Sequence, residues 1–349
     1  MPFAVLIILY LVATVGVVAL AIFVSYLADL LQKKTKYSAA LISGVLLGLM
    51  TGIPELVTGL TSVLGLNSSD LAVGDVLGSN VFNIFTLGLF TLIFFKNFKK
   101  SRIQKSEFIN IASLIVIYAL YIISFFTNGI YLLNHVFSII SLLVMIIYFV
   151  NIWFMTKQTT SEEFNRTTKS RLTVTQAIVL FATCGLCLAG GSVGLTYTAE
   201  SIINHVGMNK AFGASLFLGI TTSLPEIISV VGLFYMKNFN AGFSHLLGSN
   251  IFNCLVFAII DAISPDKVFA KDTTIQKYLV IAGLIASVLL ALGLFIHNFY
   301  HKKLRSLSLD VMLITIFSLI LLVYLTYLIL AFLHHTGNLN PFQSHQLSY

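Results

Sequence analysis

Long apolar stretches alternate with short polar segments along the whole chain. Each stretch is about 20 residues or longer, and a helix of that length, rising about 1.5 Å per residue, crosses a hydrocarbon layer roughly 30 Å thick. The pattern therefore predicts an all-α polytopic membrane protein with ten transmembrane helices. Their expected ranges are 3–31, 38–65, 70–95, 107–127, 130–155, 172–204, 210–236, 240–263, 275–299 and 309–335.

The composition agrees with membrane residence. The 349 residues are 58% hydrophobic and only 9% charged, against roughly 25% charged in soluble domains, which excludes a soluble globular protein. The net charge of +7 is typical of cytoplasmic loops of membrane proteins, so no nucleic-acid partner is expected. The three cysteines lie in apolar stretches and indicate no disulfide framework. The run 3–31 is too long for a cleavable signal peptide and has no basic residue before it.

The basic residues predict an orientation in the plasma membrane. If the N-terminus lies outside, 16 of the 20 Lys and Arg residues fall in cytoplasmic connections, as the positive-inside rule requires. A cytoplasmic loop at 156–171 and an extracellular tail at 336–349 follow from the same count of spans. The expected cytoplasmic residues are Lys33, Lys34, Lys36, Lys96, Lys99, Lys100, Arg102, Lys105, Lys157, Arg166, Lys169, Arg171, Lys237, Lys302, Lys303 and Arg305.

Two short motifs occur twice. The sequence GLMTGIPEL at 48–56 returns as GITTSLPEI at 219–227, and LGSNVFN at 77–83 returns as LGSNIFN at 247–253, identical at six of seven positions. The two glutamates are 171 residues apart and the final asparagines 170. Both motifs therefore recur together as one repeated unit.

The number of spans between the copies predicts their orientation. The first copy falls in helices 2 and 3 and the second in helices 7 and 8, so five spans separate equivalent points and the copies are inverted. We expect a first five-helix repeat at 1–155 and a second at 172–335. Inverted repeats are typical of secondary transporters, whose site lies at the midplane where the halves meet.

Two acidic residues lie deep within predicted spans, each directly after a proline. Glu55 follows Pro54 and Glu226 follows Pro225, and these are the only two of the five prolines that fall within spans. Ionisable residues inside a membrane usually face a pathway or cavity. Proline removes a helical hydrogen bond, so both helices should be broken or kinked at the midplane, with backbone oxygen exposed to an ion.

Helical spacing gathers oxygen-bearing residues around these glutamates. Side chains three or four residues apart share a helix face, and the groups near each glutamate are carboxylates, hydroxyls, amides and backbone carbonyls. Such hard donors suit Ca²⁺ and could equally hold Na⁺. The faces comprise Gly48, Thr51, Gly52, Glu55 and Thr58; Gly219, Thr222, Ser223, Glu226 and Ser229; Ser79 with Asn83; and Ser249 with Asn253.

Both repeated motifs resemble those of the Ca²⁺:cation antiporter superfamily, most closely the prokaryotic sodium/calcium exchangers. The resemblance implies exchange of Na⁺ for Ca²⁺ at a central site by alternating access, with helices 1 and 6 sliding against the other eight. It implies backbone-oxygen roles for Gly48 and Gly219. It implies side-chain ligand roles for Glu55, Glu226, Thr51, Thr222, Ser223, Ser79, Asn83, Ser249 and Asn253.

Among the positions that depart from the pattern of that superfamily, three bear on the chemistry of the site. Gly52 lacks the usual hydroxyl, which puts a full set of sodium sites in doubt. Asp75 and His245 replace the usual asparagine before the Gly-Ser-Asn element. Two interpretations of this pair stand: either both lie solvated at helix ends and tune the entrance, which we favour, or they add a carboxylate and a titratable imidazole to the pathway.

The sequence therefore predicts a secondary antiporter that moves Ca²⁺ against Na⁺ across the plasma membrane, with a Ca²⁺/H⁺ exchanger on the same scaffold as the alternative. A passive channel is disfavoured by the inverted halves. An enzyme is not expected, because no nucleophile with a paired base and no phosphate-binding loop is present. The expected partners are the transported ions and the lipid bilayer, with neither a cofactor nor an obligatory protein partner.

Overall fold

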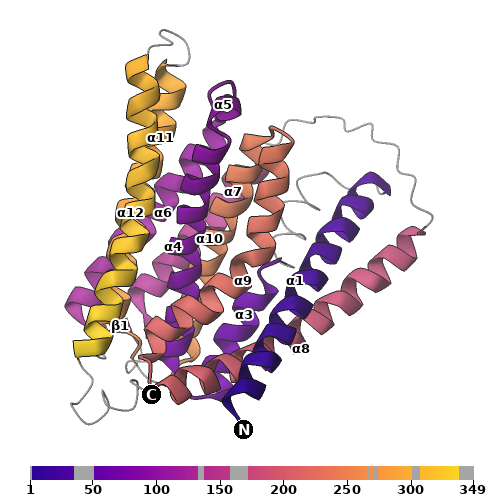
Figure 1. The fold of residues 1–349 in the computed structure, drawn as a ribbon, viewed down its shortest axis with the longest axis vertical. Coiled ribbons are helices and arrows are strands. Elements are labelled where there is room, and N and C mark those ends of the chain that lie inside the picture. Colours follow the sequence, from indigo (N-terminus) through magenta and orange to yellow (C-terminus); the bar gives the residue numbers. More distant parts are fainter. Residues whose placement is uncertain are drawn as a thin grey trace.

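The computed structural model describes residues 2–34, 51–132, 137–157, 172–265, 267–269, 274–300 and 307–337. These residues form a bundle of mostly long helices (Figure 1). In chain order the elements are α1 (Phe3–Lys34), α3 (Ile53–Leu60), the π-helix η2 (Thr61–Gly65), α4 (Ser69–Ile93), α5 (Phe95–Phe98), α6 (Lys105–Thr127), β1 (Tyr131–Leu132), β2 (Phe137–Ser138), α7 (Ile139–Lys157), α8 (Val174–Val206), α9 (Lys210–Tyr235), α10 (Phe239–Ile263), α11 (Thr274–Tyr300) and α12 (Leu307–Gly337).

The chain is an all-α polytopic membrane protein, as the hydropathy pattern predicts. Among the described residues, 8 helices are long and apolar enough to span a membrane, and two shorter apolar helices lie at Ile53–Gly65 and Ile139–Phe154. These ten segments coincide with the ten predicted spans. The first part of the predicted span 38–65 falls in residues 35–50, which lie outside the described part of the chain.

One predicted span begins later than expected. The sequence predicts a helix from residue 130, but α7 begins at Ile139. Before it, the short strands β1 and β2 pair in antiparallel fashion, with Tyr131 opposite Ser138; we call this strand pair the hairpin. Asn128 and Gly129 have positive φ values of 57° and 74°, which end α6 and turn the chain into this hairpin. Its apolar residues explain why the hairpin resembles a continuation of the helix in sequence.

Polar residues at the helix starts fix where several spans begin. The Ser68 side chain accepts a hydrogen bond from the Leu71 amide at the start of α4, and Asn238 caps α10 in the same way. Thr173 forms a capping box with Gln176 at the start of α8. Each cap satisfies a backbone donor that a helix end would otherwise leave unpaired.

Helices α1 and α8 form a pair at one side of the bundle, inclined to the other helices (Figure 1). They share a hydrophobic cluster of their own, which includes Val17, Ala21 and Val24 of α1 and Ala177 and Leu188 of α8. A larger cluster lies around α4 and α10, and a third joins α8 to Leu71 of α4 and Leu218 of α9. Helices α1 and α8 are the predicted helices 1 and 6, and they share one cluster while α8 also packs against the rest of the bundle.

Helices α4 and α9 cross at very short distance. A Cβ atom built on Gly74 would lie 2.3 Å from the Ala211 carbonyl oxygen, and one on Gly78 would lie 2.5 Å from the Ser215 Cα. Only glycine permits this approach at either position. The crossing brings the second motif of the first copy against the first motif of the second copy.

Candidate ion-binding site

Glu55 is fully buried in the first turn of α3. Gly52 precedes this helix as its N-cap and Pro54 occupies its first turn, where a missing backbone N–H costs no helical hydrogen bond. A helix therefore begins at this point in the first copy, with Pro54 in its first turn rather than in its middle.

The second copy differs at this point. α9 runs without interruption from Lys210 to Tyr235, with Pro225 inside the helix. Of the two predicted outcomes, a break or a kink, the break is therefore excluded for this helix, since a proline removes only one of its helical hydrogen bonds. Glu226 follows Pro225 and is fully buried.

The two glutamates lie near one another at the centre of the bundle. The Glu55 carboxylate interacts electrostatically with both Glu226 and Asp75. Each glutamate also lies beside the threonine of the opposite copy, Glu55 near Thr222 and Glu226 near Thr51. Because the repeats are inverted, each glutamate lies beside the threonine of the other copy.

Neither glutamate has its charge compensated by a neighbouring group in the described part of the chain. All four of their carboxylate oxygens are buried without a hydrogen-bond partner. An unpaired buried carboxylate costs several kcal/mol. A site with two of them is unfavourable when empty and is stabilised when a cation enters.

Further oxygen donors lie next to Thr222, the neighbour of Glu55, or are buried elsewhere in the interior. Ser79 Oγ donates to the Gly219 carbonyl oxygen at 3.1 Å and lies 3.3 Å from Thr222 Oγ1, so α4 and α9 contribute to one polar cluster. A Cβ on Gly219 would meet the Ser79 amide nitrogen at 2.8 Å, which explains why glycine stands there. The buried side-chain oxygens without a partner include those of Asn83, Ser223, Ser249 and Asn253.

The structure thus places most of the predicted site residues in the interior. Ser249 is half-buried, although its hydroxyl is inaccessible. Gly48 lies outside the described residues. Ser229 is half-buried, and its hydroxyl donates to the Pro225 carbonyl oxygen at 3.0 Å.

Asn80 and Asn250 form a reciprocal pair that the sequence interpretation missed. Asn80 Nδ2 donates to the Asn250 carbonyl oxygen at 3.1 Å, and Asn250 Nδ2 donates to the Asn80 carbonyl oxygen at 3.0 Å. The two residues are 170 positions apart, as are Asn83 and Asn253. A mutual contact between equivalent residues marks the pseudo-two-fold axis of the repeat. The repetition of the Gly-Ser-Asn element in the sequence could have indicated this pair.

Asp75 does not lie solvated at a helix end, so the interpretation that we favoured is wrong for this residue. Its side chain is fully buried within α4. Its Oδ2 accepts a hydrogen bond from Thr58, and its Oδ1 accepts one from Thr222 at 3.4 Å. His245, at the equivalent position of α10, is half-buried and its Nε2 is inaccessible and unpartnered among the described residues.

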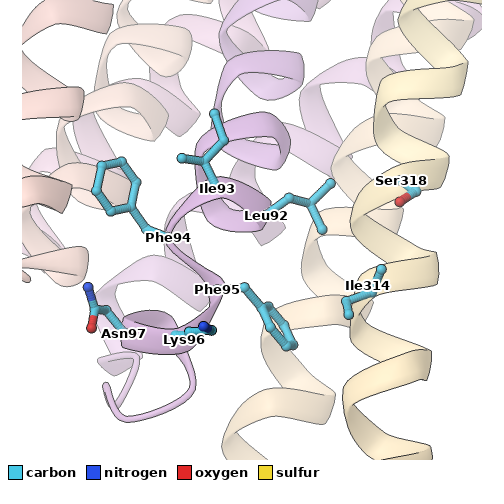
Figure 2. A pocket seen from close by; sticks show the side chains of 8 residues that line it. All are labelled: Leu92, Ile93, Phe94, Phe95, Lys96, Asn97, Ile314 and Ser318. Atoms are coloured by element: carbon cyan, nitrogen blue, oxygen red, sulfur yellow. The ribbon is translucent and has the colours of Figure 1, made fainter.

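The donor set is one of distributed oxygens. In the described part of the chain, no three His, Cys, Asp or Glu side chains converge on a single metal-ion position. A hollow of about 740 Å³ lies elsewhere, where the end of α4 and α5 meets α12, and is lined by Leu92–Asn97 with Ile314 and Ser318 (Figure 2). None of the predicted ligands lines it.

A helical bundle built from inverted repeats around buried carboxylates defines a secondary cation transporter. The sodium/calcium exchanger protein family matches residues 5–157 and 176–332. The chain belongs to this family, which consists of transporters rather than enzymes.

Known proteins agree with this assignment. A curated protein of Alkalimonas amylolytica, described as "Putative antiporter CaxA", is 30% identical over 109 residues, which cover 31% of this chain and 34% of that protein. The chain therefore matches only about a third of that relative's length.

Solved structures share the fold. The H⁺/Ca²⁺ exchanger CAX has a TM-score of 0.66 at 14% identity, over 95% of this chain and 91% of that one. The sodium-calcium exchanger NCX_Mj, soaked with Na⁺ and Sr²⁺, has a TM-score of 0.57 at 16% identity, over 91% and 97%. At these identities the likeness concerns the fold alone.

Proposed function

We propose that this chain is a plasma-membrane antiporter that exchanges Na⁺ for Ca²⁺ by alternating access. The observation that carries the proposal is the pair of buried, uncompensated carboxylates of Glu55 and Glu226. Such a site needs cationic charge, and a divalent ion and several monovalent ions can supply it in turn. The N- and C-termini face the outside in this proposal, because that orientation puts most basic residues in the cytoplasm.

The proposed ligands come from both copies. Glu55 and Glu226 provide charge, while hydroxyl, amide and backbone oxygens complete the coordination of a hard cation. The unpartnered oxygens of Asn83, Ser223, Ser249 and Asn253 support their part in this set. The remaining members are Thr51, Thr222, Ser79 and the backbone oxygens of Gly48 and Gly219.

The motion in this proposal is a displacement of α1 and α8 against the rest of the bundle. The hydrophobic cluster that α1 and α8 share supports their assignment as one moving pair. Such a displacement would expose the same carboxylates to one side of the membrane at a time.

Exchange of Ca²⁺ for H⁺ on the same scaffold is the second candidate. It is favoured by the burial of Asp75, which brings a third carboxylate near Glu55. Gly52 also removes a hydroxyl from the first copy, which weakens the case for a full set of sodium ligands.

The test is Ca²⁺ flux in sealed vesicles that contain the purified chain, with a Na⁺ gradient and a pH gradient imposed separately. Uptake driven by the Na⁺ gradient supports sodium coupling, and uptake driven only by the pH gradient supports the second candidate. Glu55→Gln and Glu226→Gln should each abolish uptake, while Glu200→Gln, outside the site in an ion pair with Lys210, should retain it. Equal uptake in all variants would exclude the proposed site.

A further inference from the structure

Asp75 stands in surroundings that differ from those of the two glutamates. Its Oδ2 accepts a hydrogen bond from Thr58 of α3, and its Oδ1 lies 3.4 Å from the hydroxyl of Thr222 of α9, which is also 3.0 Å from the Leu218 carbonyl oxygen. These neutral groups orient the carboxylate without compensating its charge. No basic side chain forms an ion pair with it among the described residues.

Other oxygens lie within the same small region. Thr58 Oγ1 is 3.1 Å from the Glu55 backbone oxygen, so a carboxylate, two hydroxyls and a carbonyl from three helices lie near one another. The unpartnered Glu55 carboxylate is fully buried and interacts electrostatically with Asp75. When its carboxyl groups are ionised, the region therefore carries more negative charge than the two glutamates alone provide.

The second copy has no equivalent arrangement. The counterpart of Asp75 is His245, and the counterpart of Thr58 is Ser229, whose hydroxyl is bonded within its own helix. The extra negative charge therefore belongs to one side of the pseudo-two-fold axis.

We propose that Asp75, with Thr58 and Thr222, forms an additional position for a monovalent metal cation, Na⁺, beside the Glu55–Glu226 site. The hydroxyl and carboxylate oxygens are hard donors suited to such an ion. The charge of this Na⁺ offsets that of the Asp75 carboxylate. The hydroxyls of the site are neutral, and a divalent ion at the glutamates offsets only the two glutamate charges. This inference rests on the proposed function, since it adds a position to the same site.

The experiment measures displacement of bound ⁴⁵Ca²⁺ from the purified full-length chain by increasing Na⁺, with choline maintaining ionic strength. In Asp75→Asn we expect the Hill coefficient for Na⁺ to fall by about one and half-displacement to need about tenfold more Na⁺. The matched control is Asp70→Asn, the same substitution on the same helix, at a residue that accepts a hydrogen bond from Gln276. Asp70→Asn should behave as the wild type.

A purely structural role of Asp75 would alter affinity and leave the Hill coefficient unchanged, because asparagine retains one acceptor oxygen. An unchanged coefficient in Asp75→Asn therefore overturns the proposal. If that variant does not fold, Thr58→Val removes one donor and keeps the carboxylate. It should raise the Na⁺ concentration for half-displacement severalfold, and no change would equally overturn the proposal.

Failure of the proposed function gives a different result. A wild-type chain that binds no Ca²⁺, or that keeps Ca²⁺ binding in both Glu55→Gln and Glu226→Gln, overturns the dicarboxylate site itself. A wild-type chain that binds Ca²⁺ through the glutamates but shows no effect of Asp75→Asn overturns only the additional position.

Discussion

The two copies of the repeat have nearly the same sequence but different surroundings. Asn83 donates to Asn250 Oδ1 at 2.8 Å, whereas the amide of the equivalent Asn253 has no partner. Gly78 packs tightly against Ser215 of α9. The equivalent Gly248 is exposed, and a Cβ there would meet no described atom within 4 Å. Since the motifs are identical at six of seven positions, the difference comes from how the other helices are arranged.

This difference bears on alternating access. Asn80 Oδ1 has no hydrogen-bond partner among the described residues. Its counterpart in the second copy is Asn250 Oδ1, which accepts the hydrogen bond from Asn83. Exchange of the two environments would let Asn253 donate to Asn80 while Asn83 releases Asn250. In the alternating-access cycle proposed above, this exchange would relate the described arrangement to a second state.

We expect the largest effect from replacing one of the two buried glutamates, which both copies share. In Glu55→Gln or Glu226→Gln, saturating Ca²⁺ should no longer raise the melting temperature, because the charge that binds it is halved. For the wild type, a ligand at a hundred times its dissociation constant stabilises by about 2.7 kcal/mol. Thermal unfolding in detergent with and without Ca²⁺ measures this.

Glu200→Gln is the control for that measurement and should keep the full shift. A shift that survives in one glutamate variant and disappears in the other would contradict the equivalence of the two copies at the ion site.

The crossing of α4 and α9 provides the next comparison. Gly78→Ala places a methyl group 2.5 Å from the Ser215 Cα, and such overpacking should cost about 1–3 kcal/mol. Gly248→Ala adds the same methyl group where no described atom opposes it, and should change stability by less than about 0.5 kcal/mol. The measurement is the melting temperature of each variant. Equal decreases would show that the glycines of both copies are tightly packed.

A smaller difference is expected between the asparagines. Asn83→Ala leaves the buried Asn250 oxygen without a donor, which should cost about 1–3 kcal/mol. Asn253→Ala removes an amide that has no partner, and should cost less than Asn83→Ala in cation-free buffer. Chemical unfolding of the two variants checks this order, and the reverse order would contradict the described asymmetry.

The sequence predicts what depends on local pattern. The spans follow from apolar runs, and the repeat brings Glu55 and Glu226 to one place without any knowledge of packing. The late start of α7 was missed because the apolar hairpin residues resemble a helix, and the continuity of α9 through Pro225 depends on tertiary support. Asp75 was misplaced because its burial is set by α3 and α9, which pack against it from distant parts of the chain.

The smallest predicted effect concerns the contact between the inclined pair and the bundle. Tyr10 of α1 donates to the Phe217 carbonyl oxygen of α9 at 2.7 Å and lies 2.5 Å from Thr221 Oγ1. The equivalent residue of α8, 171 positions later, is Phe181 and has no hydroxyl. Tyr10→Phe should therefore reproduce the chemistry of the other copy at a cost of about 1 kcal/mol.

The matched control for Tyr10→Phe is Tyr26→Phe, the same substitution at an exposed position of the same helix. Melting temperatures of both variants, measured without Ca²⁺, test the difference. A loss in Tyr26→Phe as large as in Tyr10→Phe would assign the effect to α1 as a whole. A loss confined to Tyr10→Phe would identify one of the hydrogen bonds that must break if α1 moves past α9.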